Sequence, residues 1–146
     1  MTGVLPRLVY AVTGVAPARQ RYGRTDFGKP VLLYPEGWHV GLSHSGGREA
    51  AVVSRRPAGV DMERIRPYHT ILARRVFTPD ECLRIENAKN PDAEYTRLWT
   101  LRESQAKCTG QGMKGVMALA GKPLPDGFLW RSEVKGGYIM TVCLKK

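Results

Sequence analysis

Two acidic residues separated by one position raise the first question about chemistry in this sequence. Asp61 and Glu63 flank Met62 at the end of a short apolar segment. Because side chains alternate in direction along a strand, both carboxylates project from one face of a strand predicted over 58–63. Neighbouring carboxylates repel unless a cation lies between them, and paired oxygen ligands suit Mg²⁺ better than Zn²⁺. Such a pair also occurs by chance on an exposed edge strand, so the metal hypothesis needs support from elsewhere in the chain.

A long helix is predicted downstream of this pair, from residue 91 to about residue 108. Asn90 suits the N-cap, Pro91 the first helical position, and Gly110 the position past the end. Residues spaced three and four apart place an apolar arc along one side of the helix. The members of this arc are Tyr95, Leu98, Trp99 and Ala106.

Three charged residues lie within or beside the apolar arc. Arg102 projects from its middle, where a guanidinium is costly unless it reaches an anion. Glu103 lies at the edge of the arc, and Lys107 follows one turn later. A surface ion pair would account for Glu103 and Lys107 but leaves Arg102 unexplained. This helix face is therefore a second candidate for site chemistry.

A serine and a histidine end another predicted strand, over 38–44. Ser43 and His44 stand directly before a turn that contains Gly46 and Gly47. Backbone N–H groups in such a turn are free to bind an anion, and an imidazole beside them can meet a phosphate. Since many turn histidines have no ligand, this position needs the company of other motifs.

The elements that must position these residues mix strands and helices without regular alternation. This order favours an α+β fold with antiparallel strands over a doubly wound parallel sheet. Helices are further predicted over 5–13, 69–76 and 79–88, strands over 50–54, 128–134 and 138–144, and a loop over 22–30.

Length and composition predict one domain over residues 1–146 with a core of its own. The three cysteines are far apart in sequence and lack metal-ligand spacing, which argues against a disulfide framework and favours a reducing cytoplasm. The N-terminal apolar run is broken by Pro6 and Arg7 and is unlike a signal peptide, and no segment approaches the length of a membrane span, so we expect a soluble chain. Lys and Arg exceed Asp and Glu by 23 to 13, and the net charge of +10 predicts an anionic partner.

Five motifs in order resemble those of the 4′-phosphopantetheinyl transferases of the Sfp type. The resemblance covers about residues 25–112, and a closing strand over 138–143 is also similar to that family. Lys107 and Gly110 follow the last motif at the family's spacing. The motifs are 25–30 (TDFGKP), 41–46 (GLSHSG), 59–63 (GVDME), 77–81 (FTPDE) and 99–104 (WTLRES).

The resemblance implies an antiparallel sheet packed against a long helix. It also implies transfer of the phosphopantetheine arm of coenzyme A to a serine of an acidic apo carrier protein, with release of 3′,5′-ADP. By the same resemblance, Asp61, Glu63 and Glu103 hold Mg²⁺ on the pyrophosphate. Asp61, Glu103 and Lys107 are the implied catalytic residues, with Glu103 able to take the serine proton. The residues implied to contact coenzyme A are Lys29, Pro30, Ser43, His44, Arg102 and Lys107.

Two features depart from the family pattern. Members usually carry lysine where this chain has Arg102. The change keeps the positive charge but replaces a compact ammonium with a planar guanidinium that donates several hydrogen bonds. Sfp-type enzymes also consist of two similar halves, and most of the first half has no counterpart ahead of the motif at 25–30. We therefore expect a homo-oligomer, most simply a dimer, in which a second copy supplies the opposing wall of the site.

Three other functions fit the same composition. A basic nucleic-acid-binding domain would explain the charge, but no recognisable recognition motif is present. A metal-dependent nuclease would use the same carboxylates on a phosphodiester. A degenerate transferase fold would bind coenzyme A or a carrier without turnover.

Overall fold

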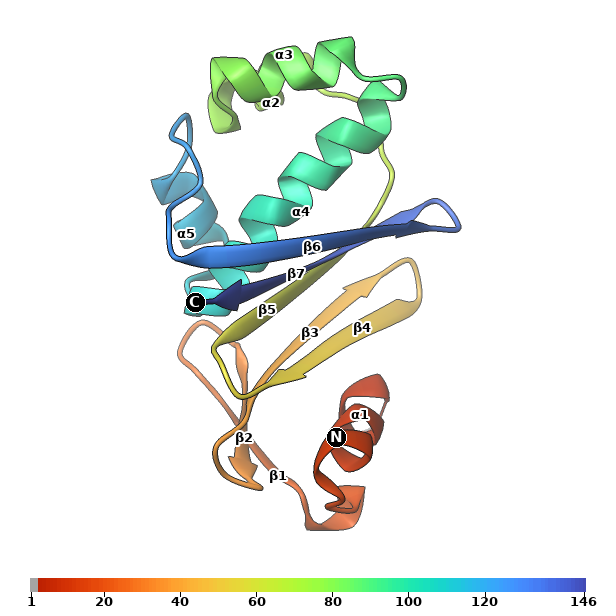
Figure 1. Ribbon diagram of the computed structural model, residues 1–146, viewed down its shortest axis with the longest axis vertical. Helices are drawn as coiled ribbons and strands as arrows, with labels where there is room; N and C mark the ends of the chain where they lie inside the picture. Colours follow the sequence, from red (N-terminus) through yellow and green to blue (C-terminus); the bar gives the residue numbers. More distant parts are fainter. Residues whose placement is uncertain (1–2) are drawn as a thin grey trace.

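The computed structural model describes residues 3–146, and Figure 1 shows how its elements are arranged. Five α-helices and seven strands alternate irregularly along this part of the chain. The helices are α1 (Val4–Thr13), α2 (Thr70–Val76), α3 (Pro79–Asn87), α4 (Pro91–Thr109) and α5 (Gly112–Ala118). The strands are β1 (Arg21–Arg24), β2 (Pro30–Tyr34), β3 (His39–Ser45), β4 (Arg48–Ser54), β5 (Ala58–Arg64), β6 (Phe128–Lys135) and β7 (Tyr138–Lys145).

All strand pairs in the described chain are antiparallel. They form two hairpins, β1–β2 and β3–β4, and a three-stranded sheet with the order β5–β7–β6. Strand β3 lies beside β5, where the Ser43 hydroxyl accepts a hydrogen bond from the Met62 backbone N–H at 3.0 Å. The mixed content and the antiparallel pairing confirm the predicted α+β class.

Strand β5 presents different chemistry on its two faces, as the alternation of its sequence predicts. Val60 and Met62 pack with Ala50 of β4 in a small apolar cluster. Asp61 and Glu63 therefore project from the other face. On that face Gly59 approaches α4 so closely that a Cβ atom at this position would collide with backbone atoms of Ser104 and Cys108.

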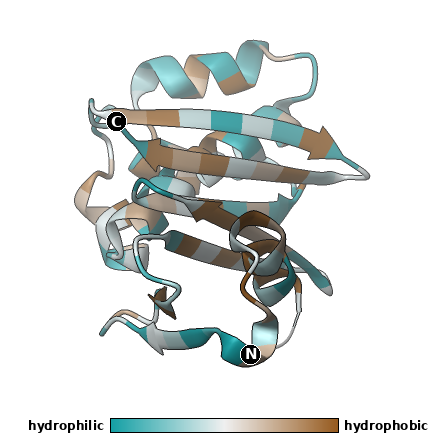
Figure 2. Ribbon diagram, turned by 60° about the horizontal axis from the view of Figure 1, so that its bottom comes forward, coloured by the Kyte–Doolittle hydropathy of each residue, from teal (hydrophilic) through white to brown (hydrophobic). Residues whose placement is uncertain are grey.

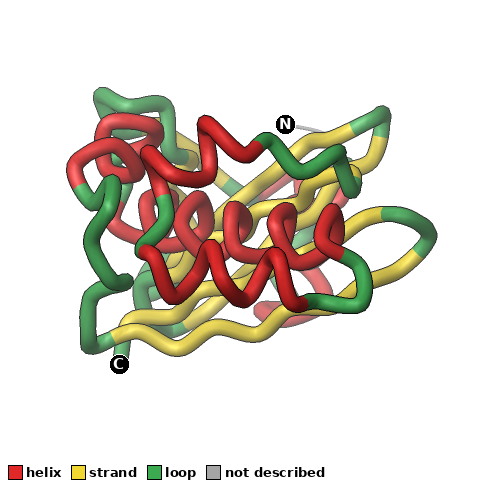
Figure 3. The backbone as a smooth tube through the Cα atoms, turned by 90° about the horizontal axis from the view of Figure 1, so that it is seen from above, coloured by secondary structure: helices red, strands yellow, loops and turns green. Residues whose placement is uncertain are grey.

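Helix α4 lies across this face of the sheet, and Figure 3 shows most of the helices in front of the strands. The Thr100 hydroxyl is 2.7 Å from the hydroxyl of Thr141 on β7. The Trp130 indole N–H of β6 donates to the Leu101 carbonyl at 3.0 Å. The ends of α4 follow the sequence expectation, since the Asn90 side chain caps its start and Gly110 ends it in the left-handed conformation.

Helices α2 and α3 cover the N-terminal half of α4. Phe77 packs edge-on against both Tyr95 and Trp99, with ring centroids 6.0 and 6.1 Å apart. A capping box between Thr78 and Glu81 starts α3, as its sequence indicates. These contacts bury the apolar arc predicted on α4.

The predictions were wrong for two segments. Residues 21–34 form the β1–β2 hairpin, whereas we expected a loop over 22–30. Its strands pack with α1 through Leu5, Val9 and Leu32. Helix α5 was also not predicted, because a glycine-containing segment gives a weak helix signal.

No helix in residues 3–146 is long and apolar enough to cross a membrane. Two of the three free cysteines, Cys108 and Cys143, are buried beside each other, although 34 positions lie between them in sequence. A hydrogen bond from the Cys143 thiol lowers the pKa of Cys108 to about 7 and raises the pKa of Cys143.

Candidate active site

The structure brings Asp61, Lys107 and Ser43 into direct contact. Lys107 Nζ donates to Asp61 Oδ1 at 2.9 Å and to Ser43 Oγ at 3.2 Å. The Asp61 side chain is 3% exposed and that of Lys107 is 32% exposed. The ion pair therefore lies at the inner end of an opening to solvent. Adjacent strands β3 and β5 and helix α4 each contribute one of the three residues.

Glu63 and Glu103 extend this group on the same face of β5. Burial, followed by the negative charge of Asp61, raises the pKa of Glu63 to about 7. The same two causes raise the pKa of Glu103. The positive charge of Lys107 acts in the opposite direction on both glutamates. Three carboxylates thus share one partly buried region with a single paired lysine between them.

The acidic group does not form a finished metal site as it stands. No set of three His, Cys, Asp or Glu side chains within residues 3–146 is arranged to hold a metal ion. One oxygen nevertheless lacks compensation: Asp61 Oδ2 is buried and has no hydrogen-bond partner among residues 3–146. Because a buried carboxylate oxygen is costly without a donor or a cation, these residues fit a hard divalent ion such as Mg²⁺.

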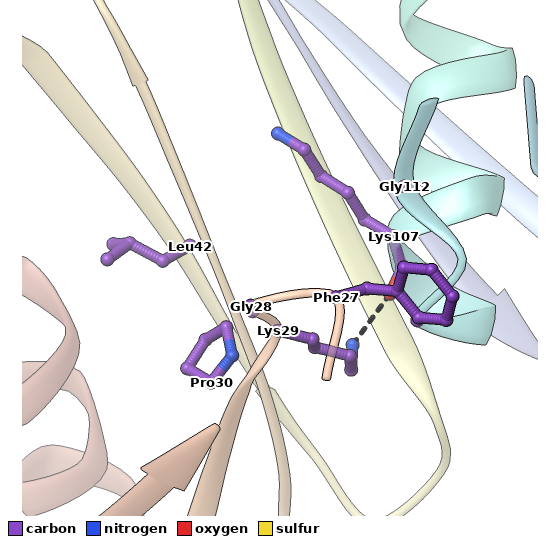
Figure 4. A pocket seen from close by; sticks show the side chains of 9 residues that line it. Phe27, Gly28, Lys29, Pro30, Leu42, Lys107 and Gly112 are labelled. Atoms are coloured by element: carbon purple, nitrogen blue, oxygen red, sulfur yellow. Dashed lines mark hydrogen bonds between the residues drawn. The ribbon is translucent and has the colours of Figure 1, made fainter. Parts of the chain in front are cut away.

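A cavity of about 170 Å³ lies beside Lys107. Figure 4 shows Leu42 and Pro30 toward one side of it and Phe27 and Lys107 toward the other, with Lys29 between them. The lining is mostly apolar, with glycines that let the backbone approach closely. An aromatic or heterocyclic group fits the apolar part of this lining, and Lys29 and Lys107, which also line the cavity, suit an attached anion.

Lys29 forms hydrogen bonds that connect two elements of the fold. Its Nζ donates to the Ala58 carbonyl at 2.7 Å and to the Lys107 carbonyl at 2.8 Å, the second of which is drawn in Figure 4. Burial, aided by the charge of Lys107, lowers the pKa of Lys29. The ammonium thus joins the start of β5 to the last turn of α4, where a cation also stabilises the helix dipole.

The structure does not bring His44 to the acidic group. Its neighbour Ser43 points toward Lys107, and alternation along β3 directs His44 to the opposite face. There its Nδ1 lies 3.6 Å from Glu49 Oε1, and its side chain is 62% exposed. A phosphate contact from His44 therefore requires a ligand that extends past the edge of β3.

Arg102 requires a correction. We expected its guanidinium to contact a phosphate of coenzyme A, but its side chain is 1% exposed. It donates to Glu81 Oε1 at 2.6 Å and to the carbonyls of Lys122 and Leu119 at 2.7 and 3.1 Å. The anion that Arg102 needs inside the apolar arc is thus Glu81, the same residue that caps α3. Arg102 joins α4 to α3 and to the segment after α5.

One charged residue of this region was not identified from the sequence. Arg66 lies two positions past β5, and its positive charge lowers the pKa of both Glu63 and Glu103. No spacing rule singles it out, because the strand has already ended at Arg64. Its position near the acids follows from the path of the chain toward α4.

Comparison with known proteins decides the family. The sequence model of the 4′-phosphopantetheinyl transferase superfamily matches residues 57–143, which is more than half of the chain. The chain belongs to this superfamily. The matched region contains Asp61, Glu63, Glu103 and Lys107.

Similar proteins carry the same family name. A 4′-phosphopantetheinyl transferase of Bacillus subtilis is 33% identical over 103 residues, which cover 68% of this chain and 46% of the relative. The transferase Sfp of Bacillus subtilis strain 168 is 27% identical over 143 residues, covering 84% and 62%. HetI of Nostoc sp. is 29% identical over 119 residues, covering 76% and 50%. The chain thus spans about half the length of the relatives it matches.

Proposed function

We propose that this chain transfers the phosphopantetheine arm of coenzyme A to a serine of an acidic apo carrier protein. The observation that carries the proposal is the group of Asp61, Glu63, Glu103 and Lys107 within the segment matched to the superfamily. We take the sheet β5–β7–β6 covered by α4 as the family's architecture, and residues 1–146 as one domain.

Asp61, Glu63 and Glu103 are the residues that would hold Mg²⁺. The unpartnered Oδ2 of Asp61 and the mutual repulsion of the three carboxylates support this assignment. When bound, the ion would neutralise charge on the pyrophosphate of coenzyme A.

Residues of the chain itself carry out the remaining steps of the transfer. The serine oxygen of the carrier attacks the phosphorus that bears the pantetheine arm, and a new P–O bond forms. The bond from that phosphorus to the bridging oxygen breaks, and 3′,5′-ADP leaves with the electron pair. Glu103 takes the serine proton, a role favoured by its raised pKa. Lys107 faces the negative charge that develops on the phosphates.

The cavity beside Lys107 suits the nucleotide part of coenzyme A. Its apolar lining includes Phe27, Pro30 and Leu42, which can pack against a base. Lys29 would keep its structural bonds and add positive charge near the phosphates. Ser43 holds Lys107 in place, and His44 could reach a more distant phosphate past the edge of β3.

The net charge of +10 suits an acidic carrier, since complementary charge speeds encounter. We further propose that the active species is a homo-oligomer, most simply a dimer, in which a second copy supplies the opposing wall of the site. Light scattering with an activity titration tests this idea. Full activity of a monomer at high dilution would contradict it.

The proposal is tested by incubating the protein with Mg²⁺, coenzyme A and apo carriers from fatty-acid, polyketide and peptide-synthetase systems. Intact mass spectrometry should show one added arm on at least one carrier. Unchanged carriers together with salt-sensitive binding of single-stranded DNA would favour a nucleic-acid-binding domain. Tight binding of coenzyme A without any transfer would favour a degenerate transferase fold.

A further inference from the structure

Arg66 is held against an aromatic surface of α4 beside the acidic group. Its Cζ lies 5.2 Å from the centroid of the Trp99 ring and 6.0 Å from that of Tyr95. Its backbone N–H donates to Thr96 Oγ1 at 3.2 Å, which ties this segment to the same helix. Backbone and aromatic contacts together fix where the guanidinium lies.

One edge of this guanidinium has no acceptor in the described part of the chain. Arg66 Nε and Nη2 are buried and make no hydrogen bond there. These two nitrogens form the edge with which arginine binds two oxygens of one carboxylate or phosphate. Because a buried donor without an acceptor is costly, a ligand that brings two oxygens gains more here than at an exposed arginine.

The position of Arg66 relative to the acids indicates which ligand this is. Its charge acts on Glu63 and Glu103, while Lys107 pairs with Asp61. No carboxylate within residues 3–146 forms an ion pair with Arg66. Two cations therefore lie near the acids. Lys107 is already paired with Asp61, whereas in the described chain Nε and Nη2 of Arg66 are free to bind an incoming anion.

We propose that Arg66 is a phosphate-binding residue of this site, which takes two oxygens of the substrate's phosphoanhydride. The inference rests on the proposed function in that the phosphoanhydride is that of coenzyme A. The Arg66 residue as a whole is only half-buried, so a ligand can approach it from solvent. Arg66 stays charged throughout and transfers no proton.

Calorimetric titration of the full chain with inorganic pyrophosphate in the presence of Mg²⁺ tests this role. Arg66→Ala should weaken pyrophosphate binding by about tenfold or more, as expected when a charged hydrogen-bonding group is lost. Arg66→Lys should give an intermediate affinity, because it keeps the charge and loses the fork. The matched control is Arg64→Ala, an exposed arginine two positions earlier, which should bind like the wild type.

Thermal melting checks that each variant is folded, and Arg66→Gln replaces Arg66→Ala in the comparison if the alanine variant unfolds. Wild-type affinity in the folded Arg66 variants would overturn the inference, as would an equal loss in Arg64→Ala. Failure of the wild type to bind pyrophosphate would overturn it too. If the wild type binds pyrophosphate but not coenzyme A, the proposed function fails, and the Arg66 comparison still decides this inference.

Discussion

The ammonium of Lys107 compensates a carboxylate that has almost no contact with solvent. Asp61 is 3% exposed and its Oδ1 accepts from Lys107 Nζ at 2.9 Å. Lys107→Met should therefore reduce the free energy of unfolding by about 3 kcal/mol, because it leaves a buried charge unpaired. Asp61→Asn combined with Lys107→Met should recover most of this loss in urea unfolding. A double variant as unstable as Lys107→Met alone would contradict this account of the pair.

Glu63 makes stability depend on pH. Its pKa is raised to about 7 from the ordinary 4.5, first by burial and then by Asp61. The folded chain thus holds this proton more tightly than the unfolded chain, so the free energy of unfolding falls as pH rises between these two values. Without divalent ions, Glu63→Gln should match the wild type below pH 4.5 and exceed it by about 1 kcal/mol at pH 8, which is less than the full shift implies because solvent screens this half-buried group. A difference that stays constant across this range would contradict the prediction.

Single residues were predictable from the sequence to different degrees. Alternation along β5 placed Asp61 and Glu63 on one face, because strand geometry fixes direction. Helical periodicity placed Arg102 inside an apolar arc and so indicated that it needs an anion, but it did not indicate which residue supplies that anion. Glu81 lies 21 positions away and reaches Arg102 only because α3 packs on α4. Long-range packing of this kind has no signature in local spacing.

At the scale of elements, Gly59 sets the distance between β5 and α4. A side chain there would collide with the backbone of Ser104 and Cys108, which cannot move aside without shifting the helix. Gly59→Ala should therefore destabilise the fold by about 2 to 3 kcal/mol and displace Lys107 from Asp61. Gly23→Ala is the control, because its nearest contact is the flexible Leu33 side chain at 3.4 Å. Equal melting temperatures for the two variants would contradict this role.

Helix α2 offers the surface on which we expect the carrier to dock. Arg74 and Arg75 are exposed there beside Ile71, which is 67% exposed. Reversing both charges should raise the KM for the carrier and weaken its salt dependence, while the KM for coenzyme A stays near its wild-type value. Arg131→Glu combined with Lys135→Glu is the control for net charge, because both residues are exposed on β6 and the double reversal changes the charge by the same amount. A rise in the KM for coenzyme A would instead assign these arginines to the nucleotide site.

Helices and strands were predicted correctly where their own sequence contains clear caps, turn residues or apolar periodicity. Caps and apolar periodicity predicted α4 to within one residue at its C-terminal end, and turn residues predicted the β6–β7 hairpin. The β1–β2 hairpin lacked such a pattern, since its strands are short and their burial depends on α1. Helix α5 forms where Gly115 packs against Ala106 of α4, a contact that its own sequence does not indicate.

In the molecule as a whole, the apolar clusters that stabilise the fold and the acidic group of the candidate site lie in different places. Figure 2 shows hydrophobic residues concentrated on the strands and helices of the interior, while hydrophilic residues colour much of the outer helices and turns. The apolar residues form three clusters in the described chain, and the acidic group lies where β3, β5 and α4 meet. This meeting point could not be read from the sequence, because β3 and β5 belong to different hydrogen-bonded sheets.

The most direct measurement of the central claim compares loaded carrier with released 3′,5′-ADP in one reaction. With Mg²⁺ and coenzyme A, we expect equal amounts of both products, and neither product after chelation of the metal. Glu103→Gln should abolish both, while the exposed control Glu86→Gln on α3 should retain them. A second, established transferase confirms that each carrier accepts the arm. Carriers that this transferase loads but the folded wild-type chain leaves unmodified, with no 3′,5′-ADP formed, would contradict the account.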